Sequence, residues 1–198
     1  MPSASVPAWH GPRDDTLGVP ALDPVVVART GDVAIAVTNL TAYQDGFSFD
    51  LDIRLRDTGD AHHQPSDRNA TDLQEAMYLY PERLFAGVRA DPERHWPDWF
   101  TLEYPHGEPA RSDPPFWTDE PAFPVLVSRR PSPAGGGGND WRFSLWACPL
   151  PTVGTMAFVC SGWPEFGVPA GQAEVQTAPL LDAASRAIIL WSSGERRT

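Results

Sequence analysis

Lysine is absent from this chain of 198 residues, and all 15 basic side chains are arginine. This absence excludes Schiff-base chemistry on a lysine amine and the phosphate-binding loop that depends on a lysine. Cysteine is scarce, with only two residues, Cys148 and Cys160. Their spacing fits neither a zinc site, which needs close pairs and four ligands, nor a C-x-x-C redox pair.

The sequence also lacks long apolar runs and a net positive charge. No window approaches the ~18 apolar residues of a membrane-spanning helix, and the first residues lack the basic start and apolar stretch of a secretory signal. We therefore expect a cytoplasmic location, where thiols stay reduced. The net charge of -11 repels phosphate backbones and anionic lipid surfaces, so neither nucleic acid nor a membrane is expected as a partner.

The clearest pattern in the sequence is that of a β-strand over residues 46–56. Five apolar side chains alternate there with polar ones: Phe47, Phe49, Leu51, Ile53 and Leu55. Period-two alternation predicts a strand with one buried and one solvated face, as in an antiparallel sheet. The Asp-Gly pair that precedes it is a hairpin signal, so we expect this strand to pair with another at 33–43.

Further strands are expected along the chain between turn-rich segments, at 25–29, 99–104, 125–130, 141–148 and 155–161. A C-terminal amphipathic helix is predicted over residues 178–191, capped by Thr177, because apolar residues from Leu180 to Trp191 recur at helical spacing. Together these elements indicate a mainly β fold, an antiparallel β-sandwich of immunoglobulin-like or Greek-key type with one C-terminal helix.

The domain organisation follows from the same pattern. One sandwich domain is expected over residues 25–192, and residues 193–198 form a tail. Residues 1–24 are rich in proline and small side chains, so they are expected to form a flexible or extended arm, tethered by Trp9 or Leu17 or not at all.

The segment from 145 to 168, LWACPLPTVGTMAFVCSGWPEFGV, holds both cysteines. We interpret it as a hairpin centred on Gly154, with strands 141–148 and 155–161 antiparallel and the cysteines facing each other. A cross-strand disulfide is geometrically possible, but a reducing compartment argues against it. The two cysteines are therefore expected to be small buried hydrophobic residues.

This segment also carries a resemblance. The run W-x-C-P-L-P-x-x-G-x-x-x-F-x-C-x-x-W-P-x-x-G-V from Trp146 to Val168, followed by A-A-x-R-A-x-x-L-W at 183–191, resembles a family of uncharacterised actinobacterial proteins. The resemblance covers roughly the last fifty residues and, more loosely, the strands from residue 25 onward. It implies a bacterial protein and no known activity, so no functional residue is carried over from it.

Two clusters of residues contain the side chains that a chemical site would need. A loop contains Asp57, Asp60, His62, His63 and Asp67, whose side chains could hold a divalent metal, but adjacent histidines point apart and no ligand spacing is met. His95 and Asp98 could orient a general base, yet no nucleophile motif accompanies them. We therefore predict no catalytic residue, no metal ligand and no cofactor.

The remaining candidates are aromatic residues in or beside the long loops. We predict a partner- or ligand-binding site at Trp96, Trp99, Phe116 and Trp117, because exposed aromatic side chains form hot spots and long irregular loops are often functional. The same side chains, with Phe123, could instead fill a satellite core beneath the loops.

Three functions remain open. The first is a non-catalytic protein-interaction or structural module that binds another protein through these long aromatic and proline-rich loops. The second is a carbohydrate- or small-ligand-binding sandwich that uses the loop tryptophans. The third is an uncharacterised enzyme. The sequence does not specify the oligomeric state.

Overall fold

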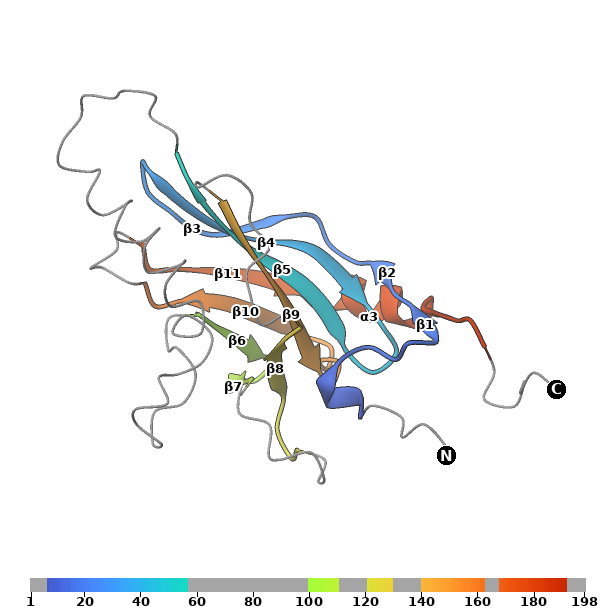
Figure 1. Cartoon of the computed structure of the whole chain (residues 1–198). Coiled ribbons are helices and arrows are strands. Elements are labelled where there is room, and N and C mark those ends of the chain that lie inside the picture. The colour runs from blue at the N-terminus through green and yellow to red at the C-terminus, as the bar shows by residue number, and fades with distance from the viewer. Residues whose placement is uncertain (1–6, 57–99, 111–120, 130–139, 163–167, 192–198) are drawn as a thin grey trace, which may run out of the picture.

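Strands make up most of the described chain. The computed structural model describes residues 7–56, 100–110, 121–129, 140–162 and 168–191. Within these ranges the elements run in this order (Figure 1): η1 Ala8–His10, β1 Thr16–Leu17, β2 Val19–Pro20, β3 Val25–Arg29, β4 Val33–Ala42, β5 Phe47–Leu55, β6 Phe100–Tyr104, β7 Glu108–Pro109, β8 Val125–Ser128, β9 Asp140–Cys148, β10 Thr155–Cys160, β11 Gly171–Gln176, α3 Ala178–Ser185 and β12 Ile188–Ile189.

The strands form two antiparallel sheets that pack against each other, and β1 pairs with β12 in a short third sheet (Figure 1). The larger sheet has the order β2-β4-β5-β9-β8, with β3 also paired to β4. The smaller sheet has the order β11-β10-β6-β7. The predicted fold class is confirmed: the chain is mainly β, with antiparallel sheets in a sandwich and one helix near the C-terminus.

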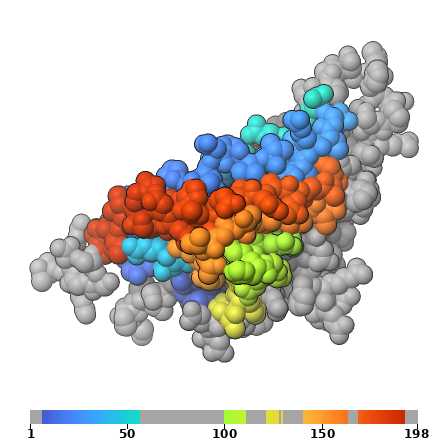
Figure 2. Space-filling view, turned by 180° about the vertical axis from the view of Figure 1, so that it is seen from behind, coloured from blue at the N-terminus to red at the C-terminus, as the bar shows by residue number. Residues whose placement is uncertain are grey.

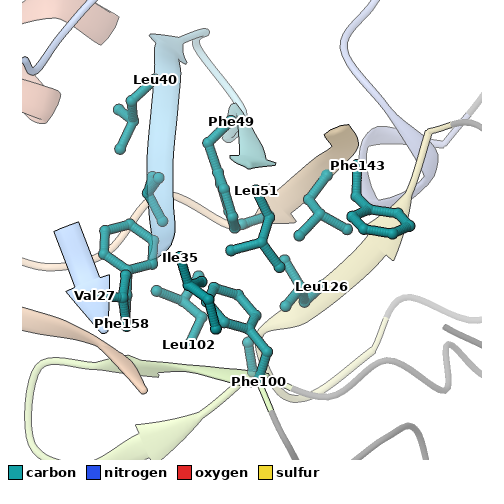
Figure 3. Close-up of a cluster of buried hydrophobic side chains, with 14 of the residues drawn as sticks. Val27, Ile35, Leu40, Phe49, Leu51, Phe100, Leu102, Leu126, Phe143 and Phe158 are labelled. Atoms are coloured by element: carbon teal, nitrogen blue, oxygen red, sulfur yellow. The ribbon is translucent and has the colours of Figure 1, made fainter. Parts of the chain in front are cut away.

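The core lies between the two sheets and is rich in phenylalanine (Figure 3). Phe49 of β5 meets Phe158 of β10 edge-on, with ring centroids 5.3 Å apart. Phe100 of β6 packs at 6.3 Å from Phe49 and 6.4 Å from Phe158. These rings join strands that are far apart in sequence, so they hold the two sheets together.

The sheets also approach each other along one edge, where β11 passes beside β3. A β-carbon added at Gly171 would collide with the carbonyl oxygen of Val27 and with Ala28. Only glycine fits this approach of backbone to backbone. One edge of the smaller sheet is thus covered by the larger one.

The predicted hairpin of residues 33–43 and 46–56 is confirmed by β4 and β5, which pair antiparallel with Ile35 opposite Ile53. One detail was wrong: the polar side of β5 is not simply solvated. Ser48 and Asp52 are buried, with exposed fractions of 8% and 4%. The reason is that β5 is a central strand with β4 and β9 on either side, and their side chains close over it.

The hairpin interpretation of residues 145–168 is wrong. Cys148 ends β9 in the larger sheet, while Cys160 ends β10 in the smaller sheet, and β10 pairs with β6 and β11 instead. The two cysteines are therefore not cross-strand neighbours. The proline-bounded link between β9 and β10 carries the chain from one sheet to the other.

Hydrogen bonds from both sides fasten this link. Tyr104 of β6 donates its hydroxyl to the carbonyl of Pro149 at 2.6 Å, and burial raises the pKa of that phenol. Thr177, fully buried before α3, donates to the carbonyl of Thr152 at 2.8 Å and accepts from the N–H of Gly154 at 2.9 Å. Thr177 was predicted to cap the helix, but its hydroxyl bonds to the link between β9 and β10 and forms no side-chain cap on α3.

The predicted helix over 178–191 is too long. Helix α3 ends at Ser185, and Ile188 and Ile189 form β12, which pairs with β1. Leu180 and Ala184 are buried as expected, but Ile188 and Trp191 are exposed. Two consecutive β-branched residues favour the extended backbone, and β1 supplies a partner for it.

The N-terminal arm is docked in the part that the structure describes. Trp146 of β9 donates its indole N–H to the carbonyl of Ala8 at 2.9 Å, and Trp9 packs on the cluster around Trp146. Phe123 packs on the same cluster. Strand β2 then pairs with β4, so Trp9 tethers the arm, whereas Leu17 is half exposed.

Candidate functional site

The site residues proposed from the sequence, Trp96, Trp99, Phe116 and Trp117, lie outside the described residues. The same is true of the loop from Asp57 to Asp67 and of the His95–Asp98 pair. The loop-binding hypothesis therefore stays a prediction. In the described ranges no three histidine, cysteine, aspartate or glutamate side chains gather as a metal site would require.

Both cysteines are buried thiols, as expected. Cys148 donates to the carbonyl of Asp45 at 3.2 Å, and Cys160 donates to the carbonyl of Pro169 at 3.3 Å. Burial raises the pKa of the Cys160 thiol, which disfavours the reactive thiolate. The environment of Cys160 therefore does not favour a nucleophile.

The most ordered group of charges is a polar strip on the outward face of the larger sheet, which consists of Thr38, Asn39, Asp50, Asp52, Arg142 and Ser144. Arg142 of β9 donates to Asp52 of β5 through Nε at 2.7 Å and Nη2 at 3.3 Å. Ser144 donates to Asp50 at 2.7 Å. These pairs are cross-strand neighbours in register, so the strip links β5 to β9.

A bulge completes the strip on the other side of β5. The register of β4 and β5 shifts between Thr38 and Thr41, and Asn39 there adopts a left-handed backbone with φ 52°. This turns its amide toward Asp50, to which it donates at 2.8 Å. Thr38 donates to Asp52 at 3.2 Å. Both carboxylates of the strip thus have partners on each neighbouring strand.

The electrostatics of the strip are those of a structural network. Burial by itself would raise the pKa of Asp52, but the hydrogen bonds and charge of Arg142, with Thr38 and Arg54, outweigh it and hold the pKa below its usual value. Asp52 is therefore ionised at neutral pH and poorly suited to act as a general acid. Since each oxygen of the two carboxylates accepts at least one hydrogen bond from a neighbouring strand, we assign the strip to sheet stability.

Another part of the surface exposes several large apolar side chains. Strand β1, strand β12 and the two residues after β12 form a structure that we call the apolar ribbon, residues 16–17 and 188–191. Its exposed fractions are 51% for Leu17, 57% for Ile188, 47% for Ile189, 40% for Leu190 and 60% for Trp191. In the described part of the chain only Val26 and Val153 are comparable large apolar residues at the surface, and each lies apart from the ribbon in sequence.

The ribbon is held in place by its base. Leu190 donates its N–H to the carbonyl of Asp15 at 2.7 Å. The side chain of Asp15 is fixed by Arg13, whose Nε and Nη2 donate at 3.0 and 2.8 Å. On the helix side, Arg186 pairs with Asp182 at 3.1 Å. Figure 2 shows the C-terminal segment, in red, at the surface of one end of the molecule.

Sequence reasoning missed this ribbon because it assigned Ile188 and Trp191 to the buried stripe of a helix. The signal that points to it is a run of four apolar residues, Ile188 to Trp191, with two β-branched residues first. An exposed run of that length is unusual on a soluble surface unless it has a function.

Comparisons with known proteins give no further guide, because no protein-family model, curated protein or solved structure matches this chain. In the described residues there is no helix with the length and apolar character needed to cross a bilayer.

Proposed function

We propose that this protein is a non-catalytic interaction module that binds another polypeptide through the apolar ribbon. The observation that carries the proposal is the exposure of five large apolar side chains on one short two-stranded structure. Large apolar side chains exposed together in one short segment are a mark of interaction surfaces, since leaving them in water is unfavourable.

The chemistry of the rest of the surface supports a protein partner. The net charge of -11 disfavours nucleic acid and anionic lipid. A ribbon with a tryptophan and four aliphatic side chains offers the aromatic and aliphatic contacts that dominate protein interfaces. A cytoplasmic location is part of the proposal, in keeping with two buried thiols.

The aromatic residues of the long loops are proposed as a second binding surface. Trp96, Trp99, Phe116 and Trp117 could extend the contact area of the module, because tryptophan is enriched at hot spots. The resemblance to an uncharacterised actinobacterial family adds no partner. The ribbon is therefore the surface on which the proposal is to be tested first.

The test is site-specific photo-crosslinking. A photoreactive amino acid is placed at Ile189 of the full chain, and at Val26 as a matched control, since Val26 is 56% exposed on β3. After irradiation in cells, the adducts are identified by mass spectrometry. We expect Ile189 to yield one dominant polypeptide adduct, either a second copy or another protein, that Val26 does not yield. Equal, diffuse adducts at the two positions would contradict the proposal.

A further inference from the structure

We propose that residues 7–10 are a removable internal ligand, which closes a peptide-binding face on the outside of the larger sheet until a partner polypeptide displaces it. The partner that fits this face is an extended segment in which a small residue precedes a tryptophan. The inference goes beyond the proposed function, because the face shares no residue with the apolar ribbon.

The face is a second hydrophobic cluster, separate from the core between the sheets. Leu126 and Ala147 are paired neighbours in β8 and β9, and both belong to the core. Val125 and Trp146 precede them on the two strands and belong to the second cluster. Successive side chains of a strand point to opposite faces, so this cluster lies on the outward face of the larger sheet. We call it the outer cluster: Val125, Trp146 and Cys148, with Tyr43, Phe123 and Val127 packed against them.

Residues 7–10 help to close the outer cluster. Trp146 is fully buried although it stands on the outward face. Ala8 and Trp9 of η1 pack on the cluster, and the Trp146 indole donates its N–H to the carbonyl of Ala8 at 2.9 Å. Figure 1 shows η1, the first blue turn, against the end of β9. The chain itself thus shows what this face accepts: an aromatic side chain, a small neighbour, and a backbone carbonyl aligned with Trp146.

The contacts of η1 are those of a weakly held segment. None of its three residues is fully buried, and no side chain caps it. The indole N–H of Trp9 is buried, and no acceptor for it lies among the described residues. A buried donor without an acceptor costs free energy that water would recover on release. Docking of Trp9 therefore gives up part of the free energy that burial of its ring supplies.

The chain has a place to open at Gly11. A β-carbon added there would meet no described atom within 4 Å, so the space beside this residue is open. The segment that follows is fixed independently of η1. Strand β1 pairs with β12, β2 pairs with β4, and Ala21 donates to the carbonyl of Leu40 at 2.9 Å. Residues 7–10 can therefore leave while the strands after them stay in place.

Opening leaves a face that is already arranged for a ligand. Tyr43 meets Trp146 edge-on, with ring centroids 5.4 Å apart, and this contact helps to hold the indole when η1 leaves. The open face then offers the Trp146 N–H to a carbonyl and the apolar side chains to an aromatic ring. The apparent affinity for a partner is lowered by the fraction of molecules that are open. Residues 7–10 therefore set how tightly a partner must bind.

Hydrogen exchange of the full wild-type chain tests the opening. The Nε1–H of Trp146 is followed by NMR and compared with the backbone amides of β5, which lies between β4 and β9. We expect the protection factor of the indole to be at least ~100-fold lower than those of the amides, because opening of residues 7–10 leaves the sheet folded. Equal protection would show that this segment leaves only on global unfolding and would overturn the inference.

Binding of a peptide added in trans tests the face. The probe is a fluorescein-labelled peptide with the sequence of residues 5–12, SVPAWHGP. The full-length Trp9→Ala variant should bind it at least ~10-fold more tightly than wild type, because its internal ligand is weakened. The same peptide carrying Trp9→Ala should not bind. Equal affinity of the variant and wild type, or no binding to either chain, would overturn the inference.

Two further variants make the binding result specific. Val26→Ala is the matched control, since Val26 is 56% exposed on β3, and it should bind the peptide as weakly as wild type. Trp146→Phe, added to Trp9→Ala, keeps a ring but removes the donor and should weaken peptide binding several-fold. Unchanged binding would show that the peptide does not use this face. Circular dichroism checks that each variant is folded, and the exchange measurement needs no variant.

These readouts are independent of the apolar ribbon. If Trp9→Ala lowers stability but gains no affinity for the peptide, residues 7–10 are a fixed strap and the inference is wrong. Photo-crosslinking at Ile189 would still decide the proposed function separately.

Discussion

Asp52 of β5 and Arg142 of β9 lie directly opposite each other in the larger sheet, and the arginine Nε donates to Asp52 Oδ1 at 2.7 Å. The carboxylate is 4% exposed, so its charge depends on partners within the protein. Removing Arg142 is costly, because the buried carboxylate of Asp52 then keeps only Thr38 and the exposed Arg54 as partners.

Arg142→Leu should accordingly lower the free energy of unfolding by about 1–3 kcal/mol. Arg54→Leu is the matched control, because Arg54 contacts the same carboxylate at 3.5 Å from a side chain that is 61% exposed. It should cost less than about 1 kcal/mol. Urea unfolding followed by circular dichroism measures both. Equal losses for the two variants would show that the hydrogen bonds from Arg142 to Asp52 are not the cause.

Acid should remove the contribution of Asp52. Burial would raise its pKa, but Arg142, Thr38 and Arg54 hold the pKa below its ordinary value in the folded protein, so the folded state favours the ionised form. Stability from this group is therefore fully present above pH ~4 and is lost as pH falls through the folded pKa. Unfolding of wild type and Asp52→Asn at a series of pH values should show a difference that shrinks on acidification. A difference independent of pH would contradict this assignment.

Thr177 should be essential to the link between the sheets. Thr177→Val removes, from a fully buried position, the hydroxyl that bonds to Thr152 and Gly154, and the loss of these two hydrogen bonds should cost about 1–3 kcal/mol. Thr177→Ser keeps the hydroxyl and should recover most of the loss. Thermal unfolding compares the two variants. If Ser destabilises as much as Val, the methyl group, and not the hydrogen bonds, is what matters.

The cysteines should resist modification in the native state. Cys160 is buried, and burial raises its thiol pKa, so alkylation requires local opening of the fold. We expect both thiols to react with a chromogenic disulfide reagent only when denaturant is added. Val153→Cys serves as the control, because position 153 is 76% exposed and should react at once. Rapid native reaction of Cys160 would show that its environment is open.

The sequence predicted the sandwich better than it predicted the connections. Alternation over Phe47 to Leu55 determines a strand face by itself, so the β4–β5 hairpin followed from local pattern. The strands that pair with β10 could not be predicted from local pattern, because strand pairing depends on contacts between residues distant in sequence. The rings of Phe49 and Phe158 lie 109 positions apart (158 − 49) and still define how the sheets meet.

The apolar ribbon was not predicted from the sequence, for a physical reason. The apolar residues from Leu180 to Trp191 have helical spacing, and spacing alone does not show where a helix ends. The end is set by tertiary pairing, since β1 offers its backbone to Ile188 and Ile189. Exposure of the ribbon could therefore be seen only once the N-terminal arm was placed beside it.

The central claim is that the apolar ribbon is covered by a protein in the cell, and cysteine accessibility measures this directly. Ile188→Cys is reacted with a membrane-permeant maleimide in intact cells and in dilute purified protein, with Val153→Cys as the reference in both. The account predicts that position 188 reacts several-fold more slowly in cells than in dilute solution, relative to position 153. The same relative rate in both settings would show that nothing covers the ribbon and would contradict the account.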